Sequence, residues 1–108
     1  MNTYDISKMT KGWFIGDFQP NVFHSKDFEV AVKYYKAGDK EGKHLHKIST
    51  EYTMIASGRV KMNSITYAAG AIIEIQPNEA TDFEALEDTI TVVVKVPSSQ
   101  NDKYLVEN

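Results

Sequence analysis

Short segments in which apolar and polar residues alternate run along this chain, with turn residues between them about every 8–12 positions. The clearest alternation lies in residues 27–36. Its two faces are Phe28, Val30, Val32 and Tyr34 on one side and Glu29, Ala31, Lys33 and Tyr35 on the other. Residues 89–96 are strongly β-branched and 71–76 are an apolar run, and no segment shows a helical period of about 3.6 residues. The pattern predicts an all-β domain, folded as a sandwich or a barrel.

Two histidines, His44 and His46, stand one residue apart, and Glu51 follows five positions after the second. Side chains alternate between the two faces of a strand, so both imidazoles are expected on one face. Residues 47–50 have the length of a hairpin loop, and this register places Glu51 opposite His46. Two imidazoles and a carboxylate suit divalent first-row metals. A half-exposed polar strand face is the alternative interpretation of the same spacing.

The spacing around these histidines resembles the first cupin motif: a glycine, an H-x-H pair, a glutamate and a second glycine at fixed intervals. The matching residues are Gly38, His44, His46, Glu51 and Gly58. The resemblance implies a cupin-type double-stranded β-helix, or jelly-roll barrel, that holds a divalent metal ion through His44, His46 and Glu51.

A second, imperfect cupin motif begins at Gly70. Glu79 stands where that motif has a glycine, and Asp82 stands where it has a third histidine. The resemblance therefore implies Asp82 as the fourth metal ligand. Oxygen-rich ligation favours Mn, Fe or Zn over Cu(I).

Three functions fit this candidate site. The first is a metal-dependent enzyme that acts on a small oxygenated or sugar-like substrate. The second is a metal-free acid/base enzyme of the sugar-modifying cupin type, with His44, His46 and Tyr35 as candidate catalytic residues. The third is a module that binds a small molecule or sugar without catalysis. Lys33, Tyr35 and Tyr52 are candidate pocket residues.

The composition limits the remaining possibilities. With 108 residues, the chain is expected to form one domain, 1–108, with 1–11 as an arm or edge segment and 98–108 as a C-terminal tail. The absence of cysteine excludes thiolate ligands and disulfides and fits the cytoplasm. A net charge of −3 without a basic run argues against nucleic acid, and no apolar run or signal-like N-terminus indicates a membrane or secretion.

The segment 11–18 is too apolar for a free tail, since it contains Trp13, Phe14, Ile15 and Phe18. It is expected to cover one end of the barrel or to contact a second subunit. Because cupin barrels are often dimeric, the resemblance also implies a homodimer.

Overall fold

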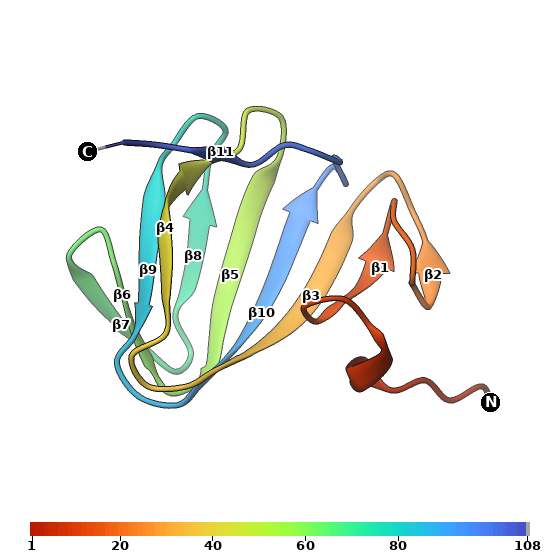
Figure 1. The fold of residues 1–108 in the computed structure, drawn as a ribbon, viewed down its shortest axis with the longest axis horizontal. Helices are drawn as coiled ribbons and strands as arrows, with labels where there is room; N and C mark the ends of the chain where they lie inside the picture. The colour runs from red at the N-terminus through yellow and green to blue at the C-terminus, as the bar shows by residue number, and fades with distance from the viewer. Residues whose placement is uncertain (108) are drawn as a thin grey trace.

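Two β-sheets face each other in the computed structural model, which describes residues 1–107 (Figure 1). The first sheet has six strands, in the spatial order β2 (Phe23–His24), β1 (Trp13–Gly16), β3 (Glu29–Tyr35), β10 (Thr89–Val96), β5 (Thr50–Ser57) and β8 (Ile72–Ile75). The second has five, in the order β11 (Tyr104–Leu105), β4 (Lys40–Leu45), β9 (Thr81–Ala85), β6 (Arg59–Met62) and β7 (Ile65–Ala68). The only helix in this part of the chain is a short 3-10 turn, η1 (Ile6–Lys8). The all-β prediction is confirmed.

From β3 onward the chain passes to the opposite sheet at almost every connection, so that successive strands wind around a common interior. β3, β5, β8 and β10 lie in one sheet, and β4, β6, β9 and β11 lie in the other. The strand pairs in this winding are antiparallel. This is the path of a double-stranded β-helix, as the resemblance implied.

The strand alternation seen in the sequence sets the two faces of the six-stranded sheet. In β10, Thr91 and Val93 are buried between the sheets, whereas their neighbours point outward and are half-buried. β3 pairs with β10 in register, with Ala31 opposite Val93, and its Lys33 and Tyr35 also face the interior. The polar face of the 27–36 segment is therefore the inner one, and its more apolar face lies on the outside of the sheet.

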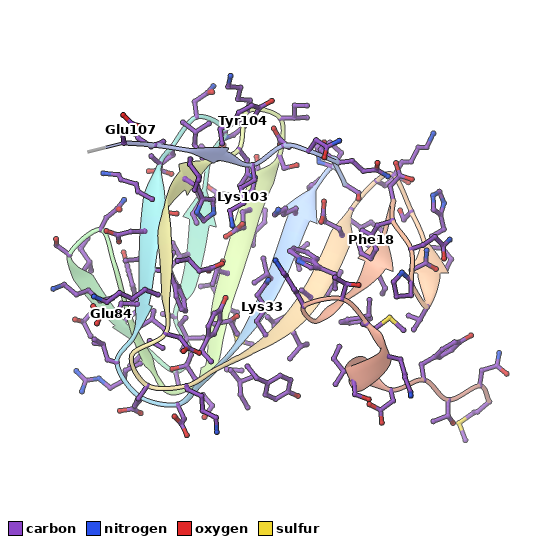
Figure 2. The ribbon with its side chains drawn as sticks, viewed as in Figure 1. Phe18, Lys33, Glu84, Lys103, Tyr104 and Glu107 are labelled. Atoms are coloured by element: carbon purple, nitrogen blue, oxygen red, sulfur yellow. The ribbon has the colours of Figure 1, made fainter. Side chains whose placement is uncertain are left out.

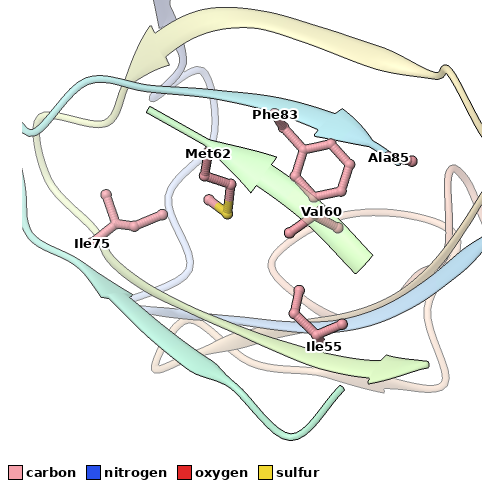
Figure 3. Close-up of a cluster of buried hydrophobic side chains, with 6 residues drawn as sticks. All are labelled: Ile55, Val60, Met62, Ile75, Phe83 and Ala85. Atoms are coloured by element: carbon pink, nitrogen blue, oxygen red, sulfur yellow. The ribbon is translucent and has the colours of Figure 1, made fainter. Parts of the chain in front are cut away.

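A cluster of buried side chains fills part of the space between the sheets (Figure 3). Its members are Ile55, Val60, Met62, Ile75, Phe83 and Ala85, contributed by β5, β6, β8 and β9. Burying a large aliphatic or aromatic side chain contributes about 1.5–3 kcal/mol. Met62 and Phe83 also line a cavity beside this cluster, so the core forms one wall of that cavity.

The predicted hairpin between the histidine segment and Glu51 is wrong. β4 and β5 lie in different sheets, because β4 pairs with β9 and β11 while β5 pairs with β10 and β8. The loop between them crosses from one sheet to the other. The histidines and Glu51 therefore meet across the interior of the barrel and not along one ladder.

Gly58 is required by a close approach between strands. Its backbone has φ = +95°, and a Cβ at this position would collide with Thr89 and the carbonyl of Asp88. The second glycine of the motif thus lets the turn between β5 and β6 pass beside the start of β10.

Within residues 1–107, no helix is both long and apolar enough to cross a membrane.

Candidate functional site

One cavity between the two sheets brings together most of the predicted site residues. It has a volume of about 230 Å³, and its wall includes His44, His46, Glu51, Lys33 and Tyr35. Both sheets contribute to it. The C-terminal segment, which crosses one end of the sheets in Figure 1, contributes Lys103.

The two imidazoles are oriented by backbone carbonyls. His46 is 4% exposed, and its Nδ1 lies 2.6 Å from the carbonyl oxygen of Asp102. The Nδ1 of His44 lies 2.9 Å from the carbonyl oxygen of Gly42. A carbonyl only accepts hydrogen bonds, so each Nδ1 donates a proton, and the neutral ring keeps its lone pair on Nε2. The ring centroids are 5.4 Å apart.

His46 Nε2 lies 3.3 Å from Glu51 Oε1, and it is buried without a hydrogen-bond partner. The other carboxylate oxygen of Glu51 accepts a hydrogen bond of 2.9 Å from Thr53. Burial raises the pKa of Glu51, but the contacts with His46 and Thr53 and the charge of Lys95 outweigh it, so the pKa lies below its ordinary value. A carboxylate oxygen thus faces Nε2 of an imidazole whose Nδ1 already donates to a carbonyl. The two atoms can share one cation, either a proton or a metal ion.

A second polar pair lies in the same wall. Tyr35 donates a hydrogen bond of 3.1 Å to Glu41. Burial, followed by the charge of Glu41, raises the pKa of the Tyr35 phenol far above its ordinary value. Tyr35 therefore stays protonated and acts as a hydrogen-bond donor, not as a phenolate base.

No protein-family model matches this sequence, and no curated protein matches it. Solved structures do resemble it. An uncharacterized conserved protein with a double-stranded β-helix domain from Klebsiella pneumoniae superposes with a TM-score of 0.73 and 19% identity over 98% of this chain and 92% of that one. An RmlC-like cupin from Shewanella frigidimarina has a TM-score of 0.65 and 12% identity over 70% of this chain and 71% of that one. This chain has the cupin fold.

The DMSP lyase DddQ from Ruegeria pomeroyi has a TM-score of 0.71 and 16% identity over 85% of this chain. The superposition covers 48% of the lyase, so this chain matches about half of that protein. The cupin fold is therefore found in at least one enzyme similar in structure to this chain.

The donors at the His46–Glu51 pair fit a divalent cation in their chemistry. His46 offers a buried Nε2 without a hydrogen-bond partner, Glu51 offers a carboxylate oxygen 3.3 Å from it, and the second imidazole lies 5.4 Å from the first. Within residues 1–107, however, no three histidine, cysteine, aspartate or glutamate side chains stand together as a complete metal-binding group. His46 and Glu51 are the part of a metal site that is already in place, and His44 is the candidate for the third ligand.

Asp82 does not reach this cavity, which corrects its expected place as the fourth ligand. Phe83 occupies the inward face of β9 in the core, so alternation turns Asp82 outward. Its carboxylate accepts a hydrogen bond of 2.7 Å from the backbone N–H of Asn63, near the end of β6. Thr81 lines the cavity instead, opposite His44 in the ladder between β4 and β9.

Tyr52 is also outside the cavity. Its neighbours Glu51 and Thr53 face inward, so Tyr52 points to the outer face of the sheet, where it lies opposite Glu74 on β8. Of the three candidate pocket residues, Lys33 and Tyr35 line the cavity.

Asp102 is a site residue that sequence reasoning missed. Its carboxylate is buried and accepts hydrogen bonds from the backbone N–H groups of Lys47, Ile48 and Ser49, at 2.9, 3.1 and 3.0 Å. Its backbone carbonyl accepts the hydrogen bond from His46 Nδ1. One residue therefore fixes both the loop between β4 and β5 and the imidazole. Residues 98–108 were expected only as a C-terminal tail, and the apolar residues Tyr104, Leu105 and Val106 are the one sequence signal that part of it docks on the domain.

Proposed function

We propose that this cupin-fold protein binds a small oxygenated or sugar-like molecule in the cavity, beside a divalent metal ion held by His44, His46 and Glu51. The observation that carries the proposal is the buried Nε2 of His46, which has no hydrogen-bond partner and faces an ionised carboxylate oxygen at 3.3 Å. Buried polar atoms rarely lack a partner, and a cation satisfies both atoms at once.

A bound divalent ion would polarise a carbonyl or hydroxyl group, or make bound water more acidic. The donor set favours Mn, Fe or Zn. The protein residues have separate tasks: the carbonyl of Asp102 fixes the tautomer of His46, Thr53 orients Glu51, and Tyr35 presents a proton-bearing oxygen in the same wall. The DMSP lyase of the same fold supports an enzymatic role.

A second candidate is a metal-free acid/base site. It is favoured by the absence of a complete three-residue metal group within residues 1–107. In this case the cation between His46 and Glu51 is a proton, and His46 moves it to or from the ligand. Tyr35 would then donate its one hydrogen bond to the ligand in place of Glu41.

Metal content distinguishes these two functions. Protein purified without chelator is expected to contain about one equivalent of Mn, Fe or Zn per chain by elemental analysis, and His46→Ala is expected to contain almost none. Wild-type protein without metal, in which His46→Ala and His44→Ala each abolish turnover of a small-molecule substrate, would support the metal-free enzyme. Ligand binding that survives both substitutions would indicate a binding module without chemistry.

We also propose a homodimer, built on the outer face of the six-stranded sheet. Val32, Val92 and Met54 lie side by side there, and Ile72 at the end of the same row is 70% exposed. Trp13 lines the cavity, so the aromatic N-terminal segment is not all available for this contact. A row of apolar residues across four strands suits the same face of a second copy.

Light scattering is expected to give about twice the 12.2 kDa mass of one chain. Ile72→Lys should give the mass of a monomer, because it places a charge in the row without disturbing the core. A wild-type monomer at micromolar concentration would contradict the dimer. The cytoplasmic location expected from the absence of cysteine remains a prediction.

A further inference from the structure

The cavity wall carries an excess of positive charge. Its lysines come from four parts of the chain: Lys11, Lys33, Lys95 and Lys103. Figure 2 labels Lys33 on β3 and Lys103 on the segment before β11. Only two carboxylates line the same cavity, Glu41 and Glu51, although the whole chain has a net charge of −3. Positive charge is therefore concentrated where a ligand would bind.

Among the described residues, none of these lysines lies within ion-pair distance of a carboxylate. The ion pairs within residues 1–107 involve Asp17, Glu51 and Glu84, and none includes a lysine of the cavity. Glu41 accepts its hydrogen bond from Tyr35, and Glu51 accepts from Thr53. The charges of Glu41 and Glu51 still act on Lys33, and that of Lys95 acts on Glu51, but neither carboxylate is within ion-pair distance of a lysine of the cavity.

Two of the lysines converge on one ring. The Nζ atoms of Lys33 and Lys95 lie 5.2 and 5.0 Å from the ring centroid of Trp13. Burial lowers the pKa of Lys33, the charge of Glu41 opposes this effect, and the charges of Lys95 and Lys103 add to it. The two ammonium groups repel each other across this part of the cavity, and an anion bound near them would offset that repulsion.

A further unpaired group points to a polar occupant. Thr91 lies in the wall of the same cavity, is 1% exposed, and its hydroxyl has no hydrogen-bond partner. The cavity volume of about 230 Å³ is below the range of about 300–1,000 Å³ that is typical of sites for drug-sized ligands. The occupant is therefore small as well as polar.

We propose that the ligand of this cavity is a small organic anion whose carboxylate or phosphate group is bound beside Trp13 by the lysines of the wall, Lys33 and Lys95 within the cavity and the exposed Lys11 and Lys103 at its mouth. This inference deepens the proposed function, since it assumes that the cavity is the ligand site, but it does not depend on a metal. Lysine ammonium groups act as point charges without a fixed fork geometry, so they suit carboxylate and phosphate alike.

The single tryptophan of the chain reports directly on this site. The measurement uses metal-free protein kept in EDTA. Collisional quenching of Trp13 fluorescence by iodide is expected to exceed quenching by neutral acrylamide by about threefold, and quenching by caesium ions should be weakest. The reason is that the positive potential of the cavity concentrates anions near the ring. Lys95→Met and Lys103→Met should each reduce the iodide preference. The control Lys61→Met, an exposed lysine on β6 outside this cavity, should leave it unchanged. Equal quenching by iodide and acrylamide in the wild type would overturn the proposal.

Competition identifies the anionic group. Malonate and inorganic phosphate are each added against iodide, with malonamide as the neutral control. Protection of Trp13 by malonate favours a carboxylate ligand, and protection by phosphate favours a phosphate ligand. Protection by neither, or equal protection by malonamide, would reject an anion site.

Because Lys103 is exposed, its variant stays informative if Lys95→Met fails to fold. The metal analysis tests a separate point. If iodide quenches Trp13 preferentially but the protein binds no metal, the anion site stands without the metal site. If the protein binds metal but iodide shows no preference, only the proposed function stands.

Discussion

His46→Ala is expected to weaken the binding of Mn²⁺ or Zn²⁺ to the chelator-treated protein by about 100-fold or more, which corresponds to about 2.7 kcal/mol. The substitution removes the buried Nε2 that faces Glu51 at 3.3 Å, and with it the preformed half of the site. Calorimetric titration of the metal-free protein measures the change. His44→Ala should have a smaller effect, because His44 is less buried and lies at the third position.

The matched control is His24→Ala. His24 is exposed and pairs with Asp17 at 2.7 Å, away from the cavity. Its replacement should leave the metal affinity unchanged. An equal loss in His24→Ala and His46→Ala, or tight binding by the His46 variant, would show that the metal is bound elsewhere.

Asp102→Ala is expected to lower the free energy of unfolding by about 3–5 kcal/mol, as measured by urea denaturation. Three backbone N–H groups, those of Lys47, Ile48 and Ser49, lose their acceptor. A buried donor without a partner costs about 1–3 kcal/mol. Asp102→Asn keeps one acceptor oxygen and should lower the free energy of unfolding by less.

Asp82→Ala is the control. Its exposed carboxylate accepts one hydrogen bond from a backbone N–H near β6, so the free energy of unfolding is expected to fall by less than about 1 kcal/mol.

The contribution of Asp102 depends on pH in a defined direction. Burial raises the pKa of its carboxyl group, but the N–H groups of Ser49, Lys47 and Ile48 outweigh burial, and the pKa lies below its ordinary value. As the pH falls, the Asp102 carboxylate is therefore protonated at a higher pH in the unfolded state than in the folded state. The stabilisation that this carboxylate gives the folded state is then lost as the pH falls below an ordinary carboxyl pKa of about 4. The stability difference between wild type and Asp102→Ala should be full at pH 6–7 and shrink toward pH 3. A difference that grows in acid would contradict this role.

Local pattern was enough to predict an all-β domain and to place four site residues, as two pairs, on shared strand faces. Alternation in 27–36 put Lys33 and Tyr35 on one face, and that face lines the cavity. The H-x-H spacing placed His44 and His46 together. Both are short-range properties that a strand fixes by itself.

The errors came from long-range pairing, which spacing does not determine. His46 and Glu51 do meet, but across two sheets, because β4 and β5 each found other partners. Asp82 was placed by motif position alone, and the core residue Phe83 decided which way its strand faces. Asp102 is separated from His46 by 56 positions, so no local pattern could connect them.

The most direct measurement is the anomalous difference density of a crystal grown with Mn²⁺. A peak within bonding distance of both His46 Nε2 and a Glu51 carboxylate oxygen is expected. A cavity without such a peak, in which His46 and Glu51 are joined by a direct hydrogen bond at saturating Mn²⁺, would contradict the metal site.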